Sequence, residues 1–197
     1  VADILKFKSE ERYDVVLCLY DVVGSSIIEG ADTKIANTIY RALRHNGRAI
    51  VSAMNLEMTQ KYCRRLDNTF SDIKTKEDFS KLIKLPASQT MQQTGEIFKG
   101  QLLLLNPDSG IVYRKEQFVD GTGLPREYVI ADKRYTGESL RKLFSKFECE
   151  DVRYVRAGRF AERLRRDERH AKEVLGIFRK VGRLNGFAKK VMSLVHR

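Results

Sequence analysis

The sequence predicts an α/β fold, because an apolar run, an amphipathic stretch and a second apolar run follow one another near its beginning. The apolar runs, residues 15–20 and 49–53, are typical of strands, and the first has the composition of a strand buried on both faces. Between them, Ile35, Ile39 and Leu43 recur at helical spacing. A strand, a helix and a strand of this length form a right-handed βαβ unit, so the two strands should be parallel neighbours in a covered sheet.

Local chemistry predicts where these elements begin and end. We expect Asp32 or Thr33 to cap the start of the helix. Residues 45–47, His-Asn-Gly, should form a turn before the second strand. An open parallel sheet binds ligands outside the carboxyl ends of its strands. Residues 19–25 are therefore a predicted ligand site.

A resemblance to a known family rests on the same stretch. The segment YDVVLCLYDVVG, followed by a helix, LRHNG and AIVSAMN, resembles the fourth strand, the next helix and the fifth strand of class I S-adenosylmethionine-dependent methyltransferases. Further on, RYTGESLRKLF resembles the segment and helix before their sixth strand, which would be residues 149–155. Residues 171–179 would be the last strand, antiparallel and inserted between the fifth and sixth. The implied fold is an incomplete Rossmann-like methyltransferase sheet, the carboxyl-terminal half, with an inserted antiparallel β lobe.

The resemblance also implies S-adenosyl-L-methionine as the cofactor. Asp3 would receive the adenine amino group and Ile4 would pack on the ring, while Leu19 and Tyr20 would flank the methionine part. Asp21 would act as a base toward a substrate hydroxyl or amine. Two plainer interpretations stay open, namely a solvated Asp3 near a chain end and an Asp21 that only shapes a turn.

The sequence departs from the family pattern in one large respect. The glycine-rich loop after the first strand, and the acidic residue that ends the second strand, have no counterpart. The Gly-x-Gly at 121–123 runs into Pro125 and not into a helix, which favours a turn. We therefore expect the sequence to be the carboxyl-terminal part of a longer methyltransferase, lacking roughly the first half of the cofactor domain and inactive alone.

Residues 55–135 are expected to form an insertion that covers the substrate. Short helices are predicted at 56–66 and 72–85, the second ended by Pro86. Three antiparallel strands should follow, at 97–105, 111–118 and 126–132; the alternative is that they extend the core. The guanidinium group of an arginine suits a carboxylate or phosphate, so Arg126 and Arg134 are candidates for substrate contact. Each could equally be a surface ion-pair partner. The residues expected to contact the substrate are Asn55, Arg126, Arg134 and Tyr135.

Composition fits one globular domain over residues 1–197, with 42% hydrophobic and 32% charged residues. The three cysteines are scattered and odd in number, which favours a reduced, cytoplasmic setting. The three histidines share no ligand-like spacing with them, so no metal site is predicted. No apolar run is long enough to span a bilayer.

The net charge of +11 is concentrated near the end of the sequence. Residues 151–197 hold 14 Lys and Arg against 5 Asp and Glu, a net of +9. Such a surface attracts anions, such as RNA or phosphorylated substrates, or is simply solvated. Residues 180–197 are predicted to form a basic helix, whose apolar stripe docks on the core or on a membrane or partner.

These observations predict a methyltransferase that acts on a small, anionic molecule or a glycan precursor. The alternatives are an RNA-binding protein, an RNA methyltransferase, or a catalytically inactive methyltransferase-like module. The segment 159–170 holds a single aromatic residue, Phe160, which favours a small substrate over RNA. If the first half of the domain is missing, residues 15–20 would form an apolar sheet edge, which invites pairing into a homo-oligomer.

Overall fold

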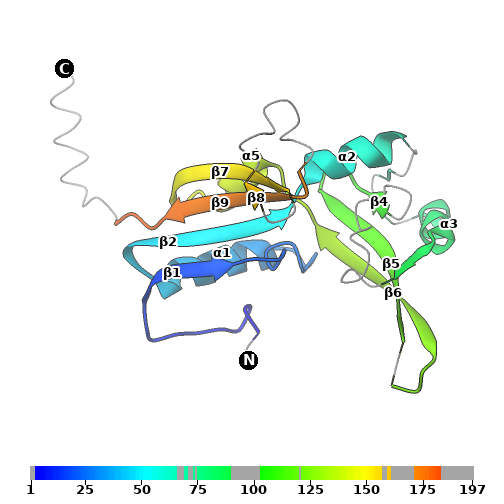
Figure 1. Ribbon diagram of the computed structural model, residues 1–197, viewed down its shortest axis with the longest axis horizontal. Coiled ribbons are helices and arrows are strands. Elements are labelled where there is room, and N and C mark those ends of the chain that lie inside the picture. The colour runs from blue at the N-terminus through cyan, green and yellow to red at the C-terminus, as the bar shows by residue number, and fades with distance from the viewer. Residues whose placement is uncertain are drawn as a thin grey trace.

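A computed structural model describes residues 3–65, 69–70, 73, 75–89, 103–119, 121–156, 159–160 and 171–182. They form two sheets that lie side by side, a main sheet and a smaller β lobe (Figure 1). In chain order the elements are β1 (Tyr13–Cys18), α1 (Ala31–Ala42), β2 (Leu43–Met54), α2 (Leu56–Arg65), α3 (Lys76–Lys84), β3 (Ala87–Gln89), β4 (Leu103–Leu105), β5 (Ile111–Val119), β6 (Pro125–Lys133), α5 (Gly137–Leu143), β7 (Glu148–Arg156), β8 (Arg159–Phe160) and β9 (Glu173–Arg179).

The main sheet has the strand order β1-β2-β9-β7-β8. β1 and β2 are parallel, with Val16 opposite Ala49 and Cys18 opposite Val51. β9 runs antiparallel to both of its neighbours, β2 and β7. The predicted βαβ unit is confirmed, and so is the prediction that the last strand is inserted, antiparallel, between the fifth and sixth strands of the family pattern.

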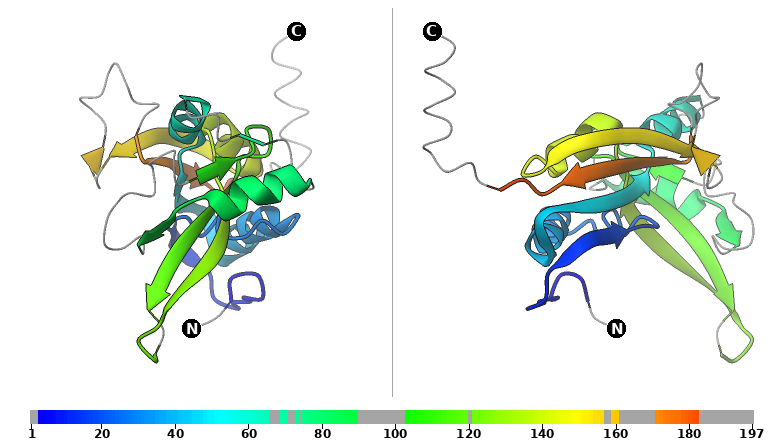
Figure 2. Two further views of the ribbon diagram at one scale, coloured as in Figure 1. Left: turned by 90° about the vertical axis from the view of Figure 1, so that its right-hand side faces the viewer. Right: turned by 60° about the vertical axis from the view of Figure 1, so that its left-hand side comes forward.

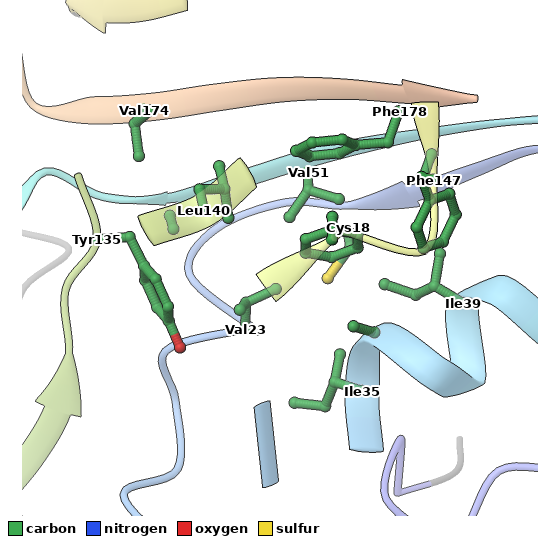
Figure 3. Packing of buried hydrophobic residues seen from close by; sticks show 14 of the residues in the cluster. Cys18, Val23, Ile35, Ile39, Val51, Tyr135, Leu140, Phe147, Val174 and Phe178 are labelled. Carbon is green, nitrogen blue, oxygen red and sulfur yellow. The ribbon is translucent and has the colours of Figure 1, made fainter. Parts of the chain in front are cut away.

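Helices α1 and α5 both pack on one face of this sheet, where the main apolar core lies (Figures 1 and 3). Ile35 and Ile39 project from α1, as their spacing predicts, and are almost completely buried. From β9, Phe178 stacks on Phe144 with 4.6 Å between ring centroids. A Cβ on Gly176 would lie 2.3 Å from the Phe178 ring, so the glycine makes room for this aromatic stack.

The opposite face of the sheet differs from the prediction. Val15 and Leu17 project there and are 51% and 61% exposed. No helix covers this face among the residues that the structure describes. β1 is an edge strand as well, so the prediction of a strand buried on both faces is wrong (Figure 2).

Two local predictions at α1 and β2 are also wrong. Gly30, in a left-handed conformation with φ of 75°, caps α1, and no side chain caps it. Asp32 lies instead in the first turn of the helix, where its carboxylate is used elsewhere. β2 already begins at Leu43, so His-Asn-Gly lies within an irregular strand, where Asn46 donates to the Lys180 carbonyl.

The β lobe is built around β5. β6 pairs with β5 along its whole length, while β4 and β3 share the other edge of β5. Alternate residues of β4 face opposite layers, because Leu103 and Leu105 pack with α2 whereas Leu104 packs with Leu82 of α3. The antiparallel lobe is confirmed, although β3 adds a parallel strand that the sequence did not predict.

The helix boundaries follow their local signals. α3 begins later than predicted, because Thr75 and Asp78 form a capping box. Thr136 and Ser139 form another at the start of α5. No helix in the described part of the chain is long and apolar enough to cross a membrane. Most of the segment 159–170, strand positions 97–102 and the predicted basic helix beyond residue 182 lie outside the described residues.

Candidate functional site

The carboxyl end of β1 turns through two residues in an unusual conformation. Tyr20 and Asp21 have φ values of 60° and 62°, a left-handed conformation that is uncommon outside glycine. The Tyr20 N–H donates to Ser52 Oγ on β2 at 3.0 Å, which ties the turn to the neighbouring strand. The Tyr20 side chain is 88% exposed. Backbone strain of this kind is typical of functional sites.

Asp21 points back over the end of β2. Its Oδ1 accepts the Met54 N–H at 3.1 Å. Burial raises the pKa of Asp21 to about 6, although the Met54 hydrogen bond, Arg134 and Arg114 act to lower it and Glu173 acts to raise it. The result is a carboxyl group that changes protonation near neutral pH.

The β lobe closes directly onto this turn. Gly24 follows Asp21 in the turn, and its carbonyl accepts the Lys133 N–H at the end of β6 at 2.9 Å. A Cβ at Gly24 would lie 2.1 Å from the Lys133 carbonyl oxygen, so only glycine fits here. The Tyr135 N–H then donates to the Met54 carbonyl at 2.9 Å. Two short backbone contacts therefore attach the lobe to the carboxyl ends of β1 and β2.

Buried charges fill the junction between the lobe and the main sheet. Asp132 forms ion pairs with both Arg134 and Arg114, and Arg114 Nε also donates to Glu116 at 2.8 Å. Arg134 Nη1 donates to Thr59 Oγ1 of α2 at 2.6 Å. Burial lowers the pKa of Arg134 to about 10, while Asp21 acts to raise it. This network lies behind the Asp21 carboxylate and contributes to its field.

The predicted substrate contacts lie in different environments. Arg126 is exposed near the start of β6, at the end of the hairpin away from Arg134. Arg134 is buried, and the Tyr135 hydroxyl donates to Asp32 at 3.1 Å. Asn55 is also buried, where its amide donates to the Ala171 carbonyl. The junction brings Asn55, Arg134 and Tyr135 together, whereas Arg126 is not part of it.

The predicted cofactor contacts lie in two groups. Leu19 and Tyr20 end β1, beside Asp21. Asp3 and Ile4 lie in the segment before β1, where Oδ1 of Asp3 accepts the Leu5 N–H at 2.9 Å and Ile4 packs at the border of the main core. Their roles stay predictions. No cluster of His, Cys, Asp and Glu in the described part of the chain could hold a metal ion.

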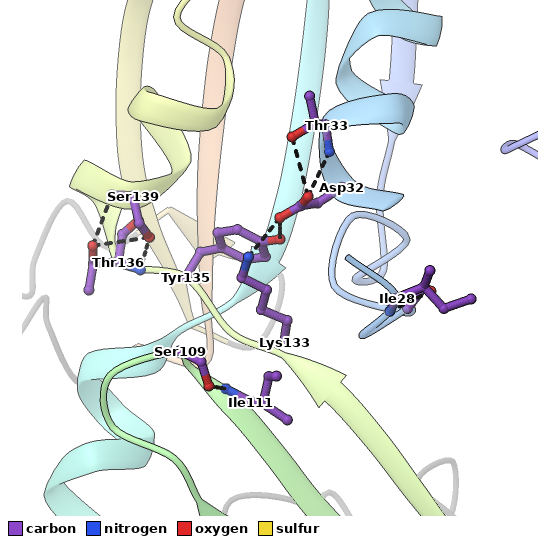
Figure 4. A network of polar contacts seen from close by, with 10 residues as sticks. Ile28, Asp32, Thr33, Ser109, Ile111, Lys133, Tyr135, Thr136 and Ser139 are labelled. Carbon is purple, nitrogen blue, oxygen red and sulfur yellow. Dashed lines mark hydrogen bonds and ion pairs between the residues drawn. The ribbon is translucent and has the colours of Figure 1, made fainter. Parts of the chain in front are cut away.

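Sequence reasoning missed one polar group in this region. The carboxylate of Asp32 accepts from Lys133 Nζ at 2.7 Å and from the Tyr135 hydroxyl (Figure 4). Asp32 is predicted only as a helix cap, and Lys133 lies just beyond the predicted strand 126–132. Their separation of about a hundred residues leaves no periodic signal, and only the RYT resemblance pointed to this segment.

Comparison with solved structures identifies the architecture. No protein-family model and no curated protein matches the sequence. The CcbJ methyltransferase from Streptomyces caelestis matches over 92% of this chain, with a TM-score of 0.57 and 11% identity. The chain has a partial methyltransferase-like fold.

A second solved structure agrees. An S-adenosylmethionine-dependent methyltransferase from Clostridium acetobutylicum matches 92% of the chain, with a TM-score of 0.51 and 11% identity. This chain spans 63% of the length of each of these two proteins. In the methyltransferase-like frame, Asp21 stands at the carboxyl end of a parallel strand, beside the lobe.

Proposed function

We propose that this chain is part of a cytoplasmic S-adenosylmethionine-dependent methyltransferase that acts on a small anionic molecule or glycan precursor. The acceptor would bind between the β1 turn and the β lobe, with Asp21 as the base that takes its proton. The observation that carries this proposal is the strained turn at Tyr20 and Asp21, which holds a carboxyl group of raised pKa at the carboxyl end of a parallel strand.

The described residues fit one side of the proposed cofactor. The half-exposed carboxylate of Asp3, beside the apolar Ile4, has the chemistry to hold an adenine ring. The exposed Tyr20 and the backbone of Leu19 are suited to flank its methionine part. The described residues supply no glycine-rich loop between a strand and a helix. When bound, the cofactor supplies an electrophilic methyl group.

Asp21 has the properties of a general base. With a pKa of about 6 it is mostly ionised at neutral pH, yet it binds a proton more readily than an exposed carboxylate does. The Met54 N–H holds the carboxylate in place, and the lobe restricts access of water to it. The acceptor would thus be positioned by Leu19 and Asp21 together with the junction residues Asn55, Arg134 and Tyr135, or by groups that these residues support. Arg126 would reach only a larger acceptor.

Two measurements test this proposal. Calorimetric titration with S-adenosylhomocysteine, on this chain and on a longer natural form of it, should detect binding at least by the longer form. In the active form, Asp21→Asn should lower the rate of methyl transfer by about 100-fold or more, the usual contribution of a general base. The matched control is Asp14→Asn on the exposed side of the same strand, which should leave the rate unchanged. Absence of binding by both forms would favour an inactive methyltransferase-like module.

The basic composition favours RNA as the second candidate partner. The net charge of +11 would support RNA binding or RNA methylation. A gel shift with single-stranded RNA that weakens steeply with salt would favour this candidate over a small acceptor.

A further inference from the structure

A cavity lies on the helix-covered side of the main sheet. Its volume is about 480 Å³, and it is bordered by α1, α5 and the segment that leads from β6 into α5. This volume is ample for a small organic molecule. Tyr20 and Asp21 do not line it, whereas Arg134 and Tyr135, two of the residues proposed to position the acceptor, do. We name it the α1–α5 groove.

One wall of the groove is formed by Asp32 and the side chains that donate hydrogen bonds to it. Asp32 accepts from Lys133 and Tyr135, and it also accepts the Thr33 N–H at 2.7 Å (Figure 4). Burial acts to raise the pKa of Asp32, but the Lys133 hydrogen bond and the other donors hold it below its usual value. Lys133 also lies over the Tyr135 ring, 5.5 Å from its centroid. The charges of Asp32 and Lys133 therefore compensate each other.

Two further ammonium groups line the groove, and among the described residues no ion pair joins either of them to a carboxylate. Lys142 comes from the last turn of α5, and Lys146 lies just beyond it, where its Nζ donates to Asn37 Oδ1 at 2.7 Å. The one other carboxylate on the lining is the exposed Asp108, on the lobe side. The lining thus carries an excess of positive charge next to the apolar side chains of Leu143 and Phe147.

We propose that the α1–α5 groove binds a small phosphomonoester with an aromatic or short aliphatic body. A phosphate monoester carries a charge of about −1.5 to −2 at neutral pH, which matches the two ammonium groups of Lys142 and Lys146. Lys133 has two further N–H donors besides the one that it gives to Asp32. The apolar body would pack on Leu143 and Phe147. This inference does not rest on the proposed function, because none of its contacts requires Asp21 or a methyl donor.

The test is calorimetric titration with phenyl phosphate. Inorganic phosphate, benzoate and benzyl alcohol serve as probes that lack the ring, the second charge and all charge, respectively. We expect phenyl phosphate to bind more tightly than each of them, and its affinity to fall with added salt. The double variant Lys142→Ala/Lys146→Ala should weaken binding by about tenfold, because two charge contacts are lost.

The matched control removes the same charge elsewhere. Lys34 on the exposed side of α1 and Lys84 at the end of α3 do not line the groove. Lys34→Ala/Lys84→Ala should change the affinity by less than about twofold. Thermal unfolding checks that both double variants are folded. Equal loss of affinity in the two double variants, equal binding of benzyl alcohol, or no binding of phenyl phosphate would each overturn the proposal. Tighter binding of benzoate than of phenyl phosphate would also overturn it, in favour of a carboxylate ligand.

Discussion

The interior behind the main sheet and the junction between this sheet and the β lobe are filled by different kinds of side chain. Behind the main sheet, the side chains that fill the interior are mostly apolar, such as Val51, Phe147 and Phe178 (Figure 3). Phe144 stacks on Phe178. At the junction, Arg114, Asp132 and Arg134 are almost as deeply buried, although all three are charged. An apolar core stabilises the fold in proportion to its buried area, whereas buried ion pairs contribute little net stability but fix one arrangement.

The two interiors therefore have different effects: the apolar core stabilises the fold, and the charged network fixes the orientation of the lobe. Apolar packing tolerates small sliding movements, since it has no directional bonds. The junction network instead depends on the direction of each hydrogen bond, such as the one from Arg134 to Thr59. The orientation of the lobe over Asp21 is therefore more narrowly defined than its apolar contacts alone would make it.

The largest effect should come from the apolar side of the comparison. Phe178→Ala removes a completely buried ring and should lower the free energy of unfolding by about 4 kcal/mol. Urea denaturation followed by circular dichroism measures this. Val119→Ala, at a position 72% exposed, should change it by less than about 0.5 kcal/mol. Similar effects of both changes would mean that the core is not where the stability lies.

At the junction, a single truncation should cost more than removal of a pair. Asp132→Ala leaves buried Arg134 and Arg114 without their shared carboxylate and should destabilise the protein by about 3 kcal/mol. The double variant Asp132→Leu/Arg134→Met should recover part of this loss, because fewer charges are left buried without compensation. Asp108→Ala, on the exposed side of the lobe, is the control. If the double variant is less stable than Asp132→Ala, the ion pairs contribute net stability, contrary to the comparison with the apolar core.

Asp21 should make stability depend on pH in the direction opposite to that of an ion-paired carboxylate. Its folded pKa of about 6 lies above the ordinary aspartate pKa of 3.8, so the folded state binds the extra proton and stability falls as pH rises from about 4 to about 6. At pH 7, Asp21→Asn should stabilise the fold by up to about 3 kcal/mol, and by almost nothing at pH 4. Denaturation at both pH values measures the difference. An equal effect at both would show that burial does not raise this pKa.

The smallest effect on stability is expected on the uncovered face of the main sheet. Leu17→Lys, at a position 61% exposed, should change the free energy of unfolding by less than about 0.5 kcal/mol. It should reduce self-association, because a lysine on an edge strand hinders pairing with another chain. Light scattering compares it with Leu124→Lys, at the turn between β5 and β6, which should leave association unchanged. A protein that is monomeric before either change would rule out association through this edge.

The parallel unit of β1, α1 and β2 was predictable because apolar runs and helical spacing are local signals, whereas the antiparallel insertion of β9 was implied by the family resemblance. The signal of the α5 capping box is also local, because Thr136 and Ser139 lie within four residues of each other. The predictions failed where a residue's burial or an element's boundary depends on contacts between residues distant in the sequence. Exposure of Val15 depends on which elements lie over the sheet, and the start of β2 depends on the pairing of Leu43 with Tyr13 of β1.

The candidate site was predictable in part for the same reason. Asp21 follows an apolar strand, which places it at a ligand-binding edge without further information. The burial of Arg134 and the partnership of Asp32 with Lys133 arise from contacts between distant segments. A charged residue near a turn has the same local pattern whether it meets a substrate or a carboxylate of its own chain.

The contact between Gly24 and Lys133 has a mechanical consequence. Because the carbonyl of Gly24 holds the end of β6 with no room for even a methyl group, the lobe and the β1 turn form one unit. A displacement of the lobe by a bound molecule would therefore be transmitted to the backbone that carries Asp21, and would alter the burial of its carboxyl group. Binding of a molecule under the lobe and the pKa of Asp21 would then be coupled through this backbone contact.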